Sequence, residues 1–201
     1  MYFRLLHDEA RGCVSYLLAD LDAGEAVLVD PRGADVPVLA AMLDEHRLQL
    51  CWVLRTHEHD AQQHAEPAAL DALGAPRVQH RAPAGTDTLV FGHEHVRVLP
   101  TPGHTPRCLS FLWRDRLFCG GLLAVDGCPQ QPRPAHPQAL WDSVTRTVFA
   151  LPPETLLFSS HAHGAGVVSS VHEQRRWHPW FAGASRDEFL ARVDALAAQP
   201  A

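Results

Sequence analysis

Three amino acids are missing from the 201-residue chain, which contains no lysine, no isoleucine and no asparagine. Without lysine it cannot form a Walker phosphate-binding loop or a Schiff base, and without asparagine it has no N-glycosylation acceptor and no Cys-His-Asn triad. No apolar run approaches the roughly 20 residues of a membrane-spanning helix. A net charge of −6 is unlike that of a general nucleic-acid binder. We therefore expect neither a nucleic-acid nor a membrane partner.

Five cysteines are spread through the chain, an odd number without a C-x-x-C pair. This usage predicts small buried side chains in a reducing cytoplasm and no disulfide scaffold. The chain is 46% hydrophobic and 20% charged, with a mean hydropathy of −0.12. These values predict one globular domain, residues 1–201, that is long enough to bury a core.

Short strand-like runs alternate with segments of helical spacing. The strand-like runs are 2–6, 13–19, 25–30, 48–54, 77–80, 94–99, 109–113, 116–119 and 155–159. The helical segments are 36–48, 67–73, 138–150, 167–177 and 186–197. Asp35 is the predicted N-cap of the first helix, and the four prolines of 129–137 predict a loop. This order predicts a layered α/β domain, with sheet packed on sheet and helices outside.

Four of the 14 histidines follow strand-like runs. His57 and His59 come directly after the fourth run. His104 follows the sixth run through a Pro-Gly turn, and His161 follows the ninth. Folds with α/β layers collect ligands at the carboxyl ends of their strands, and neutral imidazole is the commonest metal ligand. The pattern predicts a metal site; the alternative is that these are surface histidines of a histidine-rich chain.

Three further polar residues lie close to these histidines in the sequence: Asp60, His64 and His163. Imidazoles that bind a metal commonly donate their second N–H to such groups, which fixes the orientation of the ring. The three residues are therefore candidate hydrogen-bonding neighbours of the site, or else loop residues without such a role.

Five segments carry a family pattern. Residues 56–59 resemble the start of a T-H-x-H-x-D-H signature, 101–105 a T-P-G-H-T motif, 118–121 an F-T-G-D motif and 127–128 the start of G-C-G-R. The segment 161–175 resembles the tail of the persulfide dioxygenases. Together these segments resemble the metallo-β-lactamase superfamily, in particular its persulfide dioxygenase and glyoxalase II branch. The resemblance implies a four-layer αββα sandwich with a metal site along one edge.

Three ligand positions of that family pattern are lost, because Ala61, Gln62 and Gly121 stand where the resemblance implies Asp, His and Asp. A second metal ion would keep only His161, so a two-metal hydrolase site is not expected. Persulfide dioxygenases hold a single iron with two His and the Asp that is Gly121 here. Restoring all three lost residues is expected to raise the capacity toward two ions.

The remaining ligands predict a site for one divalent ion, Zn²⁺ or Fe²⁺. His57, His59 and His104 would hold it, with water at the fourth position, as in three-histidine zinc sites. His161 is expected on the far side of the same cleft, as the weakest of the four candidates.

Two functions remain open for such a site. In the first, the chain is a mononuclear metalloenzyme, a hydrolase or a sulfur dioxygenase-like protein, that acts on a small thiol, persulfide or ester. In the second, it is a non-catalytic pseudo-enzyme or binding protein that keeps the fold. The resemblance implies an Arg at Gln130 and a Tyr at His163, so recognition of glutathione is not expected. The aromatic residues Trp177, Trp180 and Phe181 form either a lid on the core or a homodimer patch.

Overall fold

The computed structural model describes residues 2–59, 66–125, 127–128, 130–131, 133–163 and 166–197. Asp60, Ala61, Gln62 and His64 lie outside these residues, and only the backbone of His163 is described. The strands are β1 (Tyr2–Asp8), β2 (Cys13–Asp20), β3 (Glu25–Val29), β4 (Gln49–Leu54), β5 (Arg77–Val78), β6 (Thr88–Phe91), β7 (Glu94–Pro100), β8 (Leu109–Trp113), β9 (Arg116–Gly120), β10 (Leu156–His163) and β11 (Gly166–Ser170). The helices are η1 (Gly33–Asp35), α1 (Val36–Glu45), α2 (Glu66–Asp71), α3 (Pro137–Asp142), η2 (Ser143–Val148), α4 (Val171–Trp177) and α5 (Arg186–Ala197).

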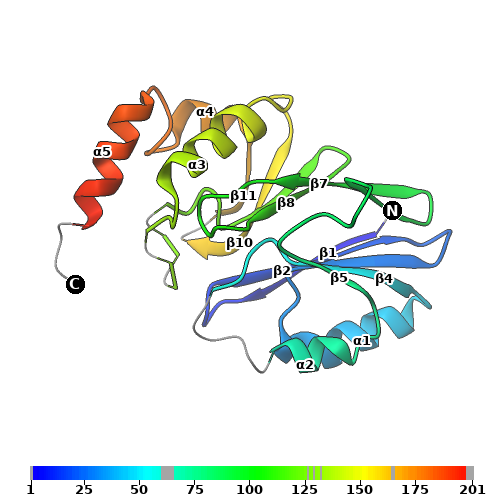
Figure 1. The fold of residues 1–201 in the computed structure, drawn as a ribbon. Coiled ribbons are helices and arrows are strands. Elements are labelled where there is room, and N and C mark those ends of the chain that lie inside the picture. The colour runs from blue at the N-terminus through cyan, green and yellow to red at the C-terminus, as the bar shows by residue number, and fades with distance from the viewer. Residues whose placement is uncertain are drawn as a thin grey trace.

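The strands form one curled sheet in the order β5-β4-β3-β2-β10-β9-β8-β7-β6, with β1 added on β2 and β11 on β10. Among the described residues a single pair, Cys13 with His161, joins β2 to β10. The sheet therefore has two halves that meet at this pair. Helices α1 and α2 lie outside the half that contains β1–β5, and α3, α4 and α5 lie outside the other half (Figure 1).

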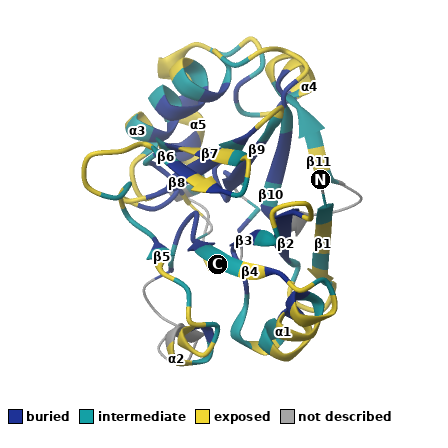
Figure 2. Cartoon of the chain, turned by 90° about the vertical axis from the view of Figure 1, so that its right-hand side faces the viewer, coloured by how far each residue is buried: buried dark blue, intermediate teal, exposed yellow. Residues whose placement is uncertain are grey.

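Alternating side chains explain these layers. Along β2, Val14, Tyr16 and Leu18 join the core between the two halves of the sheet, whereas Leu17 and Ala19 join the cluster beneath α1. Successive residues of a strand point to opposite faces, so a strand that is buried on both faces reads as a continuous apolar run. Buried strands accordingly lie inside, between helices whose outer faces are exposed (Figure 2).

The second half of the sheet repeats this arrangement. Phe118 of β9 and Phe158 of β10 pack in the central core, with ring centroids 5.2 Å apart. Leu117 and Leu157 face the other way, into a cluster with α3, η2, α4 and α5. The layers run helix, sheet, sheet, helix, which confirms the predicted αββα sandwich. None of the helices in the described part of the chain is both long and apolar enough to cross a bilayer.

Several elements differ from the sequence prediction. The prediction that a helix begins at 167 is wrong, because residues up to 170 form β11, in which Val168 pairs with Phe158 of β10. Helix α4 begins only after Ser170, which forms a capping box with Glu173. The prediction also omits β6, which pairs with β7.

Asp35 occupies the predicted N-cap position of α1, but its side chain does not form the expected capping hydrogen bond. Its carboxylate accepts hydrogen bonds from Arg32, from Nε at 2.7 Å and from Nη2 at 2.6 Å, and caps no backbone N–H of α1. The ninth predicted strand is longer than expected, because β10 continues through His161 to His163. His161 therefore lies within a strand, at the junction of the two sheet halves.

The three aromatic residues near the end of the chain differ in their surroundings. Phe181 is 4% exposed in the cluster formed by β9, β10 and α3–α5, and Trp180 packs against the same cluster. Trp177 is 64% exposed. Two of the three thus cover the core, and a homodimer patch around Trp177 stays a prediction.

Candidate metal centre

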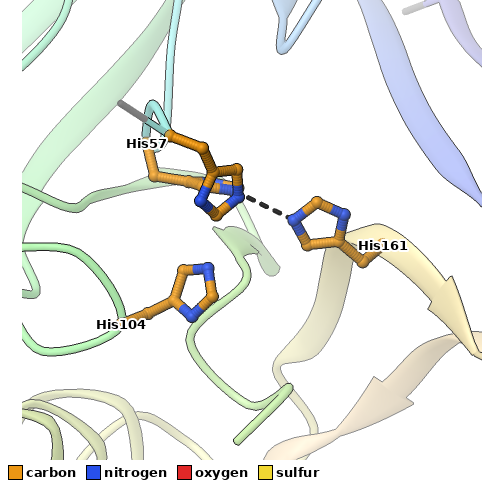
Figure 3. Close-up of side chains that lie close together, drawn as sticks. His57, His104 and His161 are labelled. Atoms are coloured by element: carbon orange, nitrogen blue, oxygen red, sulfur yellow. Dashed lines mark hydrogen bonds between the residues drawn. The ribbon is translucent and has the colours of Figure 1, made fainter. Parts of the chain in front are cut away.

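Four imidazoles meet at the junction of the two sheet halves. His57 and His59 follow β4, His104 follows β7, and His161 lies in β10. One ring nitrogen from each of these residues, here called the histidine cluster, lies within 4.8 Å of the other three. None of the four is more than 9% exposed. Figure 3 shows how His57, His104 and His161 surround one small region. The structure thus brings together all four histidines that follow strand-like runs.

Three of the rings stand nearly at right angles to one another. The ring centroids of His57, His59 and His104 are separated by 4.8, 5.0 and 5.3 Å, with interplanar angles of 79°, 80° and 89°. One nitrogen of each of these rings also lies within 4.8 Å of a nitrogen of the other two. Three imidazoles with a fourth position open are one ligand set of catalytic zinc sites.

His161 does not lie on the far side of the cleft, as expected, but contacts His57. The Nε2 atoms of the two rings are 2.9 Å apart (Figure 3). The reason is the continuation of β10, which carries His161 to the sheet junction opposite Cys13. The cluster therefore contains four imidazoles in mutual reach, instead of three and a distant fourth.

A buried carboxylate orients the His57 ring through a threonine. The Thr56 hydroxyl donates to Oδ2 of Asp30 at 2.6 Å, so it accepts from Nδ1 of His57 at 2.8 Å. The Thr56 amide and the Ser160 hydroxyl also donate to Asp30. With its proton on Nδ1, His57 presents the Nε2 lone pair to the cluster. Burial raises the pKa of Asp30, against the lowering effect of the Arg55 guanidinium.

The turn before His104 is held against α3. Gly103 has a φ of 142°, and a Cβ there would lie 2.3 Å from the Cα of Leu140. The amide of Ala135 donates to the carbonyl of His104 at 3.0 Å. The close approach of two backbones, which only glycine permits, therefore fixes where the His104 ring enters the cluster.

The missing side chain at Gly121 and the position of His104 are linked. A Cβ at Gly121 would lie 2.5 Å from Nε2 and 2.6 Å from Cδ2 of His104. The imidazole thus occupies the space that a side chain at Gly121 would need. Gly121→Asp would therefore require His104 to move, and the expectation that restoring all three lost residues raises the capacity toward two ions stays a prediction.

Two of the rings are suited to bind a cation. Burial, and to a lesser extent the neighbouring imidazoles, holds the pKa of His57 well below its ordinary value and lowers that of His104 to about 3. Both rings are therefore neutral at pH 7, the form that binds metals. Nε2 of His104 is buried and has no hydrogen-bond partner in the described part of the chain. A cation in the cluster would satisfy this atom.

The spacing of the nitrogens also fits one divalent ion. Two imidazole nitrogens on a tetrahedral zinc are about 3.3 Å apart. The contact between His57 and His161 is 2.9 Å, and the widest separation in the cluster is 4.8 Å. No Asp or Glu of the described residues belongs to the group. The imidazoles would therefore hold one ion once the widest pair moves closer together, and no Asp or Glu of the described residues joins them.

A pocket of about 400 Å³ opens beside the cluster. Asp8 pairs with both Arg32 and Arg11, and the side chain of Arg11 is 71% exposed. Guanidinium groups at a pocket wall donate charge-assisted hydrogen bonds to carboxylates and other anions. The lining of this pocket includes Arg11, Arg32, Arg55, His57, His59, Gln130 and His161. The lining also contains Asp30, and Arg32 is already paired with Asp8 and Asp35, so Arg11 is the exposed guanidinium at this wall.

Sequence reasoning misses two residues of this site. Asp30 ends a strand-like run, and its sequence context does not distinguish it from an ordinary turn residue. Cys128 is predicted only as a small buried side chain, but its Sγ lies 3.4 Å from Nε2 of His59 and 3.6 Å from Nε2 of His161. The one available signal is its place in the segment that resembles G-C-G-R, which gives no distance to the histidines.

Comparisons with known proteins show which family the chain belongs to. The mitochondrial persulfide dioxygenase ETHE1 of Homo sapiens is 30% identical over 178 residues, which is 82% of this chain and 70% of that protein. The crystal structure of ETHE1 from Myxococcus xanthus has 34% identity and a TM-score of 0.85, over 100% of this chain and 92% of that one. A metallo-β-lactamase from Staphylococcus aureus has 22% identity and a TM-score of 0.78, over 100% of this chain and 68% of that one. The chain belongs to the persulfide dioxygenase and glyoxalase II branch of the metallo-β-lactamase superfamily.

This membership confirms the resemblance that the sequence motifs carry. The metallo-β-lactamase fold is shown by the solved structures and by the observed order of layers. No protein-family model matches the sequence. The fold and the branch are thus known, and the activity has to be argued from the residues of the site.

Proposed function

We propose that this chain is a mononuclear metalloenzyme, which holds one Zn²⁺ or Fe²⁺ ion in the histidine cluster and acts on a small thiol, persulfide or ester. The observation that carries the proposal is the convergence of four buried imidazoles within 4.8 Å, beside a pocket of about 400 Å³. Pockets of this size take small molecules. The relative named persulfide dioxygenase supports a sulfur-containing substrate.

The chain's own residues would prepare the ion for such a substrate. A bound ion supplies Lewis-acid chemistry and a position for a thiolate or for water. His57, His59 and His104 would hold it, and Asp30 would keep His57 in the required tautomer through Thr56. Imidazole ligands are neutral, so the ion would keep a positive charge that favours an anionic substrate atom such as a thiolate sulfur.

Glutathione derivatives are expected to be poor substrates. Gln130 lines the pocket, and the family resemblance implies an Arg at its position. A neutral amide forms weaker hydrogen bonds to a carboxylate than a guanidinium does. Hydrolysis of a glutathione thioester, and oxygen consumption with glutathione persulfide, are expected to be far slower than a kcat of about 10 s⁻¹. Gln130→Arg is expected to lower KM for both compounds.

Metal-reconstituted protein is assayed beside the metal-free protein as a control. The panel includes small thiols, persulfides and esters without glutathione, and we expect metal-dependent turnover of at least one of them. Ordinary rates with the glutathione compounds would contradict the prediction based on Gln130. Absence of turnover in protein that has bound its ion would contradict the enzyme proposal.

The second candidate is a metal-binding protein without catalysis. The contact of 2.9 Å between Nε2 of His57 and Nε2 of His161 favours it. If all four imidazoles bind a tetrahedral ion, no position is left for a substrate, as in structural zinc sites. The same panel separates the candidates, because this protein would bind its ion and turn over none of the compounds.

We also propose that the protein works in the cytoplasm, with a small molecule as its partner. All five cysteines lie in the described part of the chain, and none of them forms a disulfide. This state is the ordinary one for thiols in a reducing compartment.

A further inference from the structure

One thiol lies directly against the histidine cluster. Cys128 is 1% exposed, and its Sγ lies 3.4 Å from Nε2 of His59 and 3.6 Å from Nε2 of His161. The same sulfur is 3.5 Å from Oε1 of Gln130. A thiol has one proton to donate. Two imidazole nitrogens and one amide oxygen therefore surround this sulfur, and its single proton can be donated to only one of them.

The two sulfur–nitrogen separations match those of ligands on one ion. With zinc–nitrogen bonds of about 2.0–2.1 Å and a zinc–sulfur bond of about 2.3 Å, a tetrahedral centre places nitrogen and sulfur about 3.6 Å apart. Cys128 has this spacing to both His59 and His161. His161 in turn contacts His57 at 2.9 Å. The sulfur thus lies at this nitrogen–sulfur spacing from two of the four imidazoles, although Cys128 is not part of the group whose ligand atoms all lie within 4.8 Å of one another.

A second observation points to a bound cation at this place. His104 is 1% exposed, and its Nε2 has no hydrogen-bond partner among the described residues. A buried polar atom without a partner costs free energy. A cation is a partner that several imidazole lone pairs and a thiolate can share.

Charge also favours the thiol as a ligand. No Asp or Glu of the described residues joins the cluster, and Gly121 stands where the family pattern has a carboxylate. A divalent cation with neutral ligands alone would keep its whole charge in a buried site, which is costly without a counter-charge. A thiolate at Cys128 would supply one negative charge beside His59 and His161.

We propose that Cys128 is a ligand of the ion in the histidine cluster, and that its thiolate replaces the carboxylate missing at Gly121. On binding, the S–H bond breaks, its proton leaves to the solvent, and a sulfur–metal bond forms without any change of oxidation state. Thiolate and imidazole together favour Zn²⁺ or Co²⁺ over Mg²⁺ or Mn²⁺. This inference rests on the proposed function, because both need the same metal centre. With Cys128 bound beside His57, His59 and His104, the substrate would take a fifth position on the ion.

Cobalt titration of the metal-free, full-length protein tests this assignment. We expect visible d–d bands together with a thiolate-to-cobalt charge-transfer band in the near ultraviolet. Cys128→Ser is expected to lose the charge-transfer band and to keep the visible bands. Loss of a residue that only hydrogen-bonds to a metal ligand lowers metal affinity by roughly 10–100-fold. Loss of a ligand itself should lower the cobalt affinity of Cys128→Ser by more than this. Cys119→Ser is the matched control, because Cys119 is 4% exposed and donates to the carbonyl of Phe158; it should keep both bands.

The outcomes of the cobalt titration distinguish failure of the Cys128 assignment from failure of the proposed function. Cobalt binding without a charge-transfer band in the unmodified protein would overturn the role of Cys128 and leave the proposed function standing. This result needs no variant, so it holds even if Cys128→Ser does not fold. A charge-transfer band that persists in Cys128→Ser would also overturn the assignment, in favour of another thiol such as Cys13. Failure of the unmodified protein to bind cobalt or zinc would instead refute the proposed function.

Discussion

His57→Ala is expected to abolish zinc binding. The His57 ring is the centre of the cluster, with centroids 4.8, 5.0 and 5.0 Å from those of His59, His104 and His161. Its removal deletes one ligand and also the contact that holds His161. Isothermal titration of the metal-free protein with Zn²⁺ measures the effect. The zinc affinity should fall at least about 100-fold, which is more than the loss expected when a residue that only hydrogen-bonds to a ligand is removed.

The control is a histidine outside the cluster. His95 is exposed on β7, and His95→Ala is expected to bind zinc as the unmodified protein does. His161→Ala is expected to weaken binding without abolishing it, because three nearly perpendicular rings remain. An unchanged zinc affinity in His57→Ala would show that the ion binds elsewhere.

Gly121→Asp is expected to lose metal binding and to destabilise the protein, although it restores a carboxylate of the family pattern. The new Cβ would lie 2.5 Å from Nε2 of His104, so the ring must leave its place. Overpacking of a buried site costs roughly 1–3 kcal/mol. Denaturant unfolding of the metal-free protein measures the loss of stability, and zinc titration measures the loss of affinity.

A double-mutant cycle isolates the cause of this loss. His104→Ala empties the space beside Gly121, so the free energy of unfolding should fall much less when Gly121→Asp is added in this background. Equal losses in both backgrounds would mean that His104 does not occupy that space. Tight zinc binding by the single variant Gly121→Asp would contradict the exclusion of a carboxylate from the cluster.

Much of the fold could be predicted because its strands are buried on both faces. The run from Val14 to Ala19 is apolar apart from Ser15 and Tyr16, and its side chains alternate between two clusters. Strand β11 could not be predicted in this way. Val167 and Val168 fit a helix as well as a strand, and the pairing of Val168 with Phe158 depends on a contact between separate segments.

The candidate ligands could be predicted because strand ends fix where they lie. His57 and His59 follow the buried strand β4, and His104 follows a turn that requires glycine. The contact of His161 with His57 could not be predicted from the sequence, because it depends on how far β10 continues. The position of Cys128 beside the histidine cluster could not be predicted either. Cys128 lies in an irregular segment, and the path of such a segment is set by tertiary contacts that no local sequence pattern records.

The ratio of metal to protein tests the central claim, one ion held mainly by imidazoles, most directly. Protein without a histidine tag is stripped of metal, reconstituted with excess Zn²⁺ or Fe²⁺, desalted and measured by elemental analysis. We expect about one ion per chain, since the cluster offers four imidazoles and no carboxylate among the described residues. Two ions per chain, or none, would contradict the claim.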